Sequence, residues 1–155
     1  MVFTVPDKLN GLFLFRPAEM YNLLFRTAWE TISQFSYTKL HSETGMVAVL
    51  HTWGQNLSLH PHLHCIVPGG GINYTGHWSQ VKISENGKTF LFPVKNLSAV
   101  FRGKFIESIK RQFSQDKSFI SELYRTQWVV YAKEPFAGPE QVIEYGEYSW
   151  ARYIQ

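Results

Sequence analysis

Hydrophobic residues recur along this chain with two different periods. A period of three to four residues predicts two long amphipathic helices, one over 17–37 and one from Asn96 or Ser98 to Phe113. Short runs of β-branched and aromatic residues predict strands instead. The predicted strands are 2–5, 46–53, the stretch after 57, 78–83, 89–92 and 127–132. This order of helices and strands indicates an α+β domain with a mainly antiparallel sheet.

The segments between these elements carry turn and loop residues. Loops are predicted over 7–15 and at the glycine run 69–71, and Asn86-Gly87 has the composition of a hairpin turn. A short helix is predicted over 119–124. The strand 46–53 is apolar at almost every position, so we expect it to be buried on both faces. In the first long helix, Trp29 belongs to the apolar stripe and is expected in the core.

Three of the six histidines occupy alternate positions in one short stretch. Because a strand projects alternate residues to the same face, His62 and His64 are expected to point the same way. His60 joins them unless Pro61 bends the strand. The residues expected on the opposite, core-facing side are Leu63, Cys65 and Val67.

This histidine pair predicts a metal site. Neutral imidazole is a good ligand for many transition ions, and two ligands leave the ion open to a third protein ligand and to substrate. Two residues, His60 and Gln141, compete for the third position, and Glu144 is a further alternative. Solvated strand histidines are the ordinary alternative, since a His-x-His pattern alone is a weak signal. A structural zinc site is not expected, because Cys65 is the only cysteine.

Composition narrows the class of protein. The chain has 155 residues, 45% of them hydrophobic, which suits one domain with a real core. The net charge of +3 and the pI near 9.0 permit nucleic-acid binding without demanding it. A single cysteine excludes an internal disulfide and fits the reducing cytoplasm. No apolar run is long enough for a membrane span, and the first residues do not resemble a signal peptide.

A last helix is predicted from Glu140 towards the end of the chain. Gln141, Tyr145 and Tyr148 lie near one face of that helix. A tyrosine can attack phosphorus and form a covalent intermediate, although packing against the sheet is the ordinary alternative. For a nucleic-acid partner, contacts are expected from the basic face of the second long helix and from tryptophans that can stack on bases, with a solvated helix face as the ordinary alternative. These candidates are Arg102, Lys104, Lys110 and Arg111, with Trp53 or Trp78.

One long segment resembles the catalytic core of the two-tyrosine HUH transposases, the rolling-circle insertion-sequence family. It reads His51-Thr52-Trp53-Gly54-Gln55-Asn56-Leu57, followed by His60-Pro61-His62-Leu63-His64-Cys65-Ile66-Val67-Pro68-Gly69-Gly70-Gly71. Three further stretches match the same family, at 2–6, at 90–94 and at 128–136 with 138–142. The resemblance therefore covers nearly the whole chain.

The resemblance implies a fold and a reaction. It implies a ferredoxin-like or RRM-like core, Mg²⁺ or Mn²⁺ held by His62 and His64, and Tyr145 as the nucleophile. The implied substrate is single-stranded DNA at insertion-sequence ends, nicked and rejoined through a 5′-phosphotyrosine during DNA transposition. The chain then corresponds to a single catalytic domain, residues 1–155, without the family's amino-terminal zinc-binding region and carboxy-terminal segment. A homodimer is left open.

The chain departs from the family pattern at the second tyrosine. The family's two tyrosines are usually four residues apart, whereas Tyr148 follows Tyr145 by three. On a helix this rotates the second hydroxyl by about 100°. An alternative is therefore a remnant that binds single-stranded DNA without cleaving it. A third alternative is a metal hydrolase that uses activated water.

Overall fold

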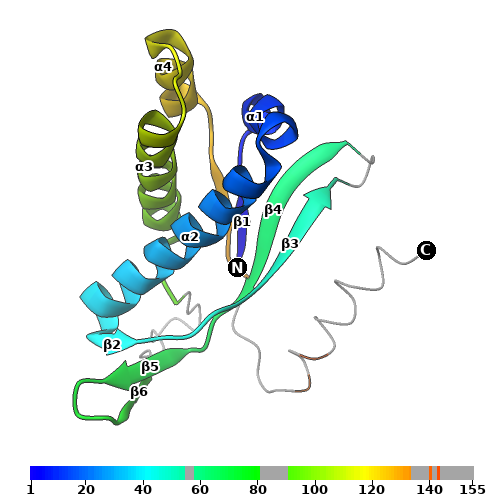
Figure 1. Ribbon diagram of the computed structural model, residues 1–155. Helices are drawn as coiled ribbons and strands as arrows, with labels where there is room; N and C mark the ends of the chain where they lie inside the picture. The colour runs from blue at the N-terminus through cyan, green and yellow to red at the C-terminus, as the bar shows by residue number, and fades with distance from the viewer. Residues whose placement is uncertain (55–57, 81–90, 134–139, 141–142, 144–155) are drawn as a thin grey trace.

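A four-stranded antiparallel sheet with helices packed on one face organises the protein (Figure 1). The computed structural model describes residues 1–54, 58–80, 91–133, 140 and 143. The strand order is β3-β4-β1-β7, and a second sheet has the order β2-β5-β6. The strands are β1 (Val2–Thr4), β2 (Ser42–Glu43), β3 (Val47–Trp53), β4 (Leu59–Ile66), β5 (Gly70–Asn73), β6 (Trp78–Gln80) and β7 (Val129–Tyr131). The α+β class is confirmed, and the architecture is consistent with the HUH fold.

Strand register separates the two faces of the four-stranded sheet. Phe3 of β1 pairs with Leu63 on one side and with Val130 on the other, and all three are buried. The Phe3 ring meets Phe101 of α3 at 5.0 Å between centroids, so this row faces the helices. Cys65 is also buried on this side, as expected, and Val67 packs against the core.

The helical layer is built from two long helices and several short ones. The α-helices are α1 (Asn10–Phe15), α2 (Pro17–Phe35), α3 (Val94–Gln112) and α4 (Lys117–Arg125). A 3₁₀ turn, η1 (Asp7–Leu9), precedes α1, and a π turn, η2 (Ser36–Leu40), follows α2. In the described residues no helix combines the length and apolar character needed to cross a membrane.

The segment 7–15 is helical, and the predicted loop is wrong. Leu9 and Phe13 are fully buried and stand one helical turn apart, so coiling the segment places both in the core. The prediction for Trp29 is also wrong, since its side chain is exposed while the neighbouring Ala28 is buried. The apolar stripe of α2 lies rotated away from Trp29 and is centred on Leu24, Ala28 and Ile32.

The amino-terminal ends of α3 and α4 differ in their capping, because only α4 has a side-chain cap. Neither Asn96 nor Ser98 caps α3, because that helix begins at Val94 directly after Pro93. The Ser98 hydroxyl instead donates to the carbonyl oxygen of Trp128, tying α3 to the approach of β7. In α4, the Asp116 carboxylate accepts from the backbone N–H of Phe119, a regular amino-terminal cap.

The glycine run belongs to a strand, which corrects the predicted loop. Gly70 and Gly71 begin β5, which pairs with β2 and β6 at the end of α2 (Figure 1). A Cβ at Gly71 would lie 2.4 Å from the carbonyl oxygen of Glu43, and one at Gly70 would lie 2.4 Å from that of Ser79. Only glycine permits such close strand approach at these two positions.

Two strand predictions need correction, and others fall outside the described residues. The strand β3 is not buried on both faces, because Val47 and Trp53 are exposed. Leu91 and Phe92 form a bend rather than a strand, and the buried Phe92 ring packs on Phe35. The Asn86-Gly87 turn and residues 81–83 and 89–90 lie outside the described residues.

Candidate metal centre

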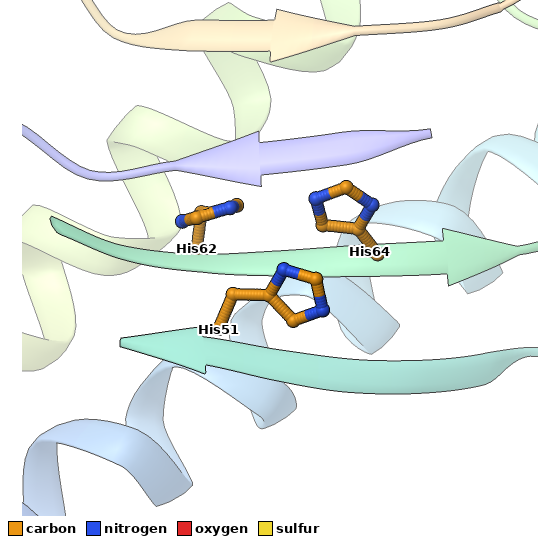
Figure 2. A group of neighbouring side chains, drawn as sticks. All are labelled: His51, His62 and His64. Carbon is orange, nitrogen blue, oxygen red and sulfur yellow. The ribbon is translucent and has the colours of Figure 1, made fainter. Parts of the chain in front are cut away.

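Three imidazole rings converge on the face of the sheet that points away from the helices (Figure 2). His62 and His64 come from β4, and His51 comes from the neighbouring strand β3. One ring nitrogen of each lies within 4.8 Å of the corresponding nitrogens of the other two. That separation allows a single ion to contact all three side chains.

Antiparallel register explains why these histidines meet. His51 pairs directly with His62, and Val49 pairs with His64. Since side chains alternate along each strand, His51, His62 and His64 share one face, and Leu63 points to the other. His51 and His62 are buried, at 8% and 9% exposure, and His64 is partly buried.

The rings hold each other in place. The His51 and His64 rings stack with centroids 4.2 Å apart and planes 23° apart, and His62 lies 5.2 Å from each. The Nδ1 of His62 is 2.6 Å from the backbone carbonyl oxygen of His60, so Nδ1–H donates to that oxygen. This bond fixes the tautomer and leaves Nε2 of His62 as the lone-pair donor, the arrangement common in metal-binding histidines.

The environment keeps the three imidazoles neutral. Burial lowers the pKa of His51 and of His62. A nearby histidine lowers each pKa further, His62 in the case of His51 and His60 in the case of His62. Burial, with His51 and His62 beside it, lowers the pKa of His64 from 6.5 to about 4. Neutral imidazole is the metal-binding form, so no proton has to be displaced at neutral pH.

The donor set fits a transition ion. Three imidazole nitrogens suit transition ions such as Zn²⁺, Fe²⁺ or Ni²⁺, whereas Mg²⁺ prefers an all-oxygen shell. Three protein ligands leave coordination positions open, as in catalytic rather than structural sites. Cys65 does not contribute, because its side chain is buried on the core side and burial raises its pKa to about 12. The cluster can therefore bind a metal and keep room for a substrate oxygen.

Of the other candidate ligands, the structure describes only His60, which lies outside the three-residue cluster. His60 is not one of the three, and its Nδ1 lies 3.4 Å from the Asp7 carboxylate instead. Gln141 and Glu144 lie outside the described residues, as do Tyr145 and Tyr148. Ligation by His60 or Gln141 and catalysis by the tyrosines therefore stay predictions.

His51 is the member of the cluster that the sequence pattern did not predict. The period of two along one strand links His60, His62 and His64 but carries no information about the preceding strand. A signal was present, because two strands joined by a short turn form an antiparallel pair whose opposed residues can be counted from the turn. That count brings His51 close to His62.

The predicted DNA contacts fall on two different parts of the molecule. The cations Arg102, Lys104, Lys110 and Arg111 are on α3, which packs on the face opposite the histidines, so they lie away from the cluster. Arg102 donates to the carbonyl oxygen of Tyr124, and Lys110 pairs with Glu107 at 2.8 Å. Trp53 is 52% exposed and ends β3, the strand of His51, whereas Trp78 is in the smaller sheet.

Comparison with known proteins assigns the chain to a family. A family model described as "Putative transposase" (Y2_Tnp) matches residues 45–155. The "Putative transposase y4qJ" of Sinorhizobium fredii (strain NBRC 101917 / NGR234) is 39% identical over 170 aligned residues, covering 96% of this chain and 42% of that protein. The "Transposase for insertion sequence element IS801" of Pseudomonas savastanoi pv. phaseolicola is 33% identical over 85 residues, 55% of this chain and 20% of that protein.

The family match includes all three histidines of the cluster. No solved structure matches the chain. The chain spans less than half the length of either transposase named above. The family match begins at residue 45 and so contains His51, His62 and His64 together. The chain belongs to this transposase family.

Proposed function

We propose that this chain is a catalytic core for DNA transposition that nicks single-stranded DNA and transfers the strand in a metal-dependent reaction. The observation that carries the proposal is the cluster of three neutral imidazoles on two adjacent strands, in a chain of the transposase family. The substrate is a single strand at the ends of an insertion sequence, by the resemblance of the segment from His51 to Gly71 to HUH enzymes.

In this proposal His51, His62 and His64 hold one divalent ion. A bound ion of this kind polarises the scissile phosphate and stabilises the charge that develops on it. Of the two ions that the resemblance implies, we favour Mn²⁺, because Mg²⁺ dehydrates reluctantly and demands near-ideal octahedral oxygen ligation. The low pKa of His64 supports a ligand role, since a ring that is neutral at pH 7 has no proton to donate as a general acid.

The nucleophile in this proposal is Tyr145. Its Oη attacks the phosphorus of the scissile phosphodiester, and the bond from phosphorus to the 3′ oxygen breaks. The phenol proton ends on the released 3′ hydroxyl, and the 5′ phosphate stays joined to the tyrosine. The phosphotyrosine bond conserves the energy of the broken bond, so rejoining to another 3′ hydroxyl needs no ATP.

A covalent-adduct assay tests the proposal. Purified chain, Mn²⁺ and a labelled single strand from an insertion-sequence end are expected to give an adduct that survives denaturing electrophoresis. Tyr145→Phe and the double variant His62→Ala/His64→Ala are expected to give none, while Tyr148→Phe serves as the matched tyrosine control. Absence of any adduct with the wild-type chain would contradict the proposal.

A second candidate is a remnant that binds single strands without cleaving them. The observation that favours it is the three-residue spacing of Tyr145 and Tyr148, which departs from the family's four. It predicts salt-sensitive binding with no adduct and little metal affinity. In the same assay, cleavage that persists in Tyr145→Phe would instead indicate hydrolysis by activated water.

A further inference from the structure

A groove in the helical layer, between the end of α3 and α4, is lined by cations and aromatic rings (Figure 1). Its volume is about 720 Å³, within the range of about 300–1,000 Å³ that is usual for small-molecule sites. The helix α3 packs on the sheet face opposite the histidines, as the contact between Phe101 and Phe3 shows. The groove and the candidate metal centre are therefore separate parts of the molecule.

Three cationic side chains line the groove, namely Lys110 of α3 and Lys117 and Arg125 of α4. Lys117 and Arg125 are exposed, and neither forms an ion pair within the described residues. Arg125 donates from Nε and Nη2 to oxygen atoms of Ser121, at 3.4 and 2.9 Å, which holds the guanidinium along α4. Within the described part of the chain no Asp or Glu is among the lining residues. The lining therefore attracts an anion.

A carboxylate at the edge of the groove, that of Glu107 on α3, is occupied by two of the lining residues. It accepts hydrogen bonds from Lys110 Nζ at 2.8 Å and from Tyr124 Oη at 3.0 Å. The charge of Lys110 is thus largely compensated, and the position of the Tyr124 hydroxyl is fixed. Lys117 and Arg125 remain as the two charges that a bound anion can use.

The rest of the lining is apolar and aromatic. Phe113 is buried and Ile120 is partly buried, so these two side chains form the part of the groove next to the core. Tyr124 lies one helical turn after Ile120 and is 39% exposed. A ring that is held at its hydroxyl and open on its face can stack on a planar ligand. A ligand with both an anionic group and a planar ring matches the whole lining.

We propose that the groove between α3 and α4 binds one nucleotide, with its phosphate beside Lys117 and Arg125 and its base stacked on Tyr124. Two sources supply this chemistry, a free nucleotide or an unpaired nucleotide within a DNA strand. An acidic peptide would satisfy the two cations but would leave the aromatic wall unused. The nucleotide in this groove is not the one that reacts, because the groove is on the other side of the sheet from the histidines.

Calorimetric titration with thymidine 5′-monophosphate in EDTA tests the groove without any metal. The double variant Lys117→Ala/Arg125→Ala is expected to bind at least about ten-fold more weakly than the wild type, as for lost hydrogen bonds to a charged group. Tyr124→Ala is expected to lose roughly five- to 150-fold, the range typical of one base stack, and Tyr124→Phe to bind normally. Lys95→Ala is the matched control, because Lys95 is exposed on α3 about 22 Å along the helix from Lys110.

Fluorescence anisotropy in EDTA with two labelled strands of equal length distinguishes the two sources. One strand is oligothymidine, and the other has the same phosphates and sugars without bases. If the groove holds a nucleotide of a strand, Tyr124→Ala is expected to weaken binding of oligothymidine and to leave the abasic strand unaffected. Either the free nucleotide or the strand supports the proposal when both Tyr124→Ala and Lys117→Ala/Arg125→Ala bind it more weakly than the wild type.

Three results would overturn the proposal. The first is that Tyr124→Ala or the double variant binds both the free nucleotide and oligothymidine like the wild type. The second is that inorganic phosphate binds as tightly as the nucleotide, which would show a site for anions alone. The third is that hexaglutamate competes as strongly as the nucleotide, which would show a docking site for an acidic protein segment. Unchanged melting temperatures of the variants confirm that any loss of affinity is not a loss of folding.

Discussion

The two faces of the four-stranded sheet differ although they are made from the same strands. On the face towards the helices, Phe3, Leu63 and Val130 form a fully apolar row against Phe101. On the opposite face, one residue further along each strand, the positions hold histidines and solvent-exposed side chains. A displacement of one residue in the sequence therefore separates the core from the candidate metal centre.

This difference shows how the fold can support a reactive site without weakening itself. The core face carries apolar burial, and the register that it enforces also sets which histidines oppose each other. The histidine face contributes little apolar burial, so its residues are free to be chosen for chemistry. Substitutions on the two faces should accordingly have separable effects on stability and on metal binding.

The largest expected effect is a loss of stability from substitution on the core face. Leu63 and His64 test it, because these neighbours in the sequence lie on opposite faces of the sheet. Leu63→Ala removes a fully buried side chain from the core row and is expected to cost about 2–5 kcal/mol of unfolding free energy. His64→Ala, one residue along, is expected to cost less than about 1 kcal/mol. Urea denaturation in EDTA measures both, and similar losses for the two variants would show that the faces are not energetically distinct.

A smaller effect is expected from pH. The pKa of His64 is lowered from 6.5 to about 4 in the folded chain, so below pH 6.5 the unfolded chain binds more protons than the folded chain. The contribution of His64 to stability without metal is therefore expected to be constant above about pH 6.5 and to fall as the pH drops towards 4. The upper bound for the contribution of His64 to this loss is about 3 kcal/mol. The contribution is smaller than this bound, because the ring is partly exposed to solvent.

Thermal unfolding at pH 7 and pH 5 in EDTA checks the direction. His51 and His62 shift in the same sense, so they add to the loss. His64→Gln is the matched variant, because it keeps a polar side chain that does not titrate, and it should reduce the difference between the two pH values. A chain that is more stable at pH 5 than at pH 7 would contradict these pKa directions.

The smallest expected effect concerns the helical side of the molecule. Arg111 is exposed near the end of α3, on the layer opposite the histidine face. If it contacts a phosphate, Arg111→Ala weakens single-strand binding modestly and lowers the slope of log affinity against log salt by about one. An unchanged slope would remove Arg111 from the DNA-binding surface.

Much of the fold was predictable because its signals are local. The strand alternation at Leu63 and Cys65 and the period of α2 both follow from patterns within one element. The glycine run does not predict its own strand, because that strand depends on close approach to Glu43 and Ser79 on two other strands. Residues 7–15 do not predict their helix, because a helix only about two turns long shows too little of its period.

The histidines of the candidate site also differ in how far the sequence predicts their positions. His62 and His64 were predictable because both lie on one strand and the period of two links them. His51 was not predicted, because its place depends on the register between β3 and β4, and that register shifts between His51 and Trp53. His60 satisfies the same period as His62 but lies outside the three-residue cluster, next to Asp7.

Calorimetric titration with Mn²⁺ tests the central claim most directly, using two histidines that the sequence alone does not distinguish. The wild-type chain and His60→Ala are expected to bind one ion each with similar affinity. His51→Ala is expected to lower the affinity for Mn²⁺ at least 10- to 100-fold. Changing even a residue that only hydrogen-bonds to a metal ligand typically costs that much. Retained affinity in His51→Ala, or an equal loss in His60→Ala, would contradict a metal centre formed by His51, His62 and His64.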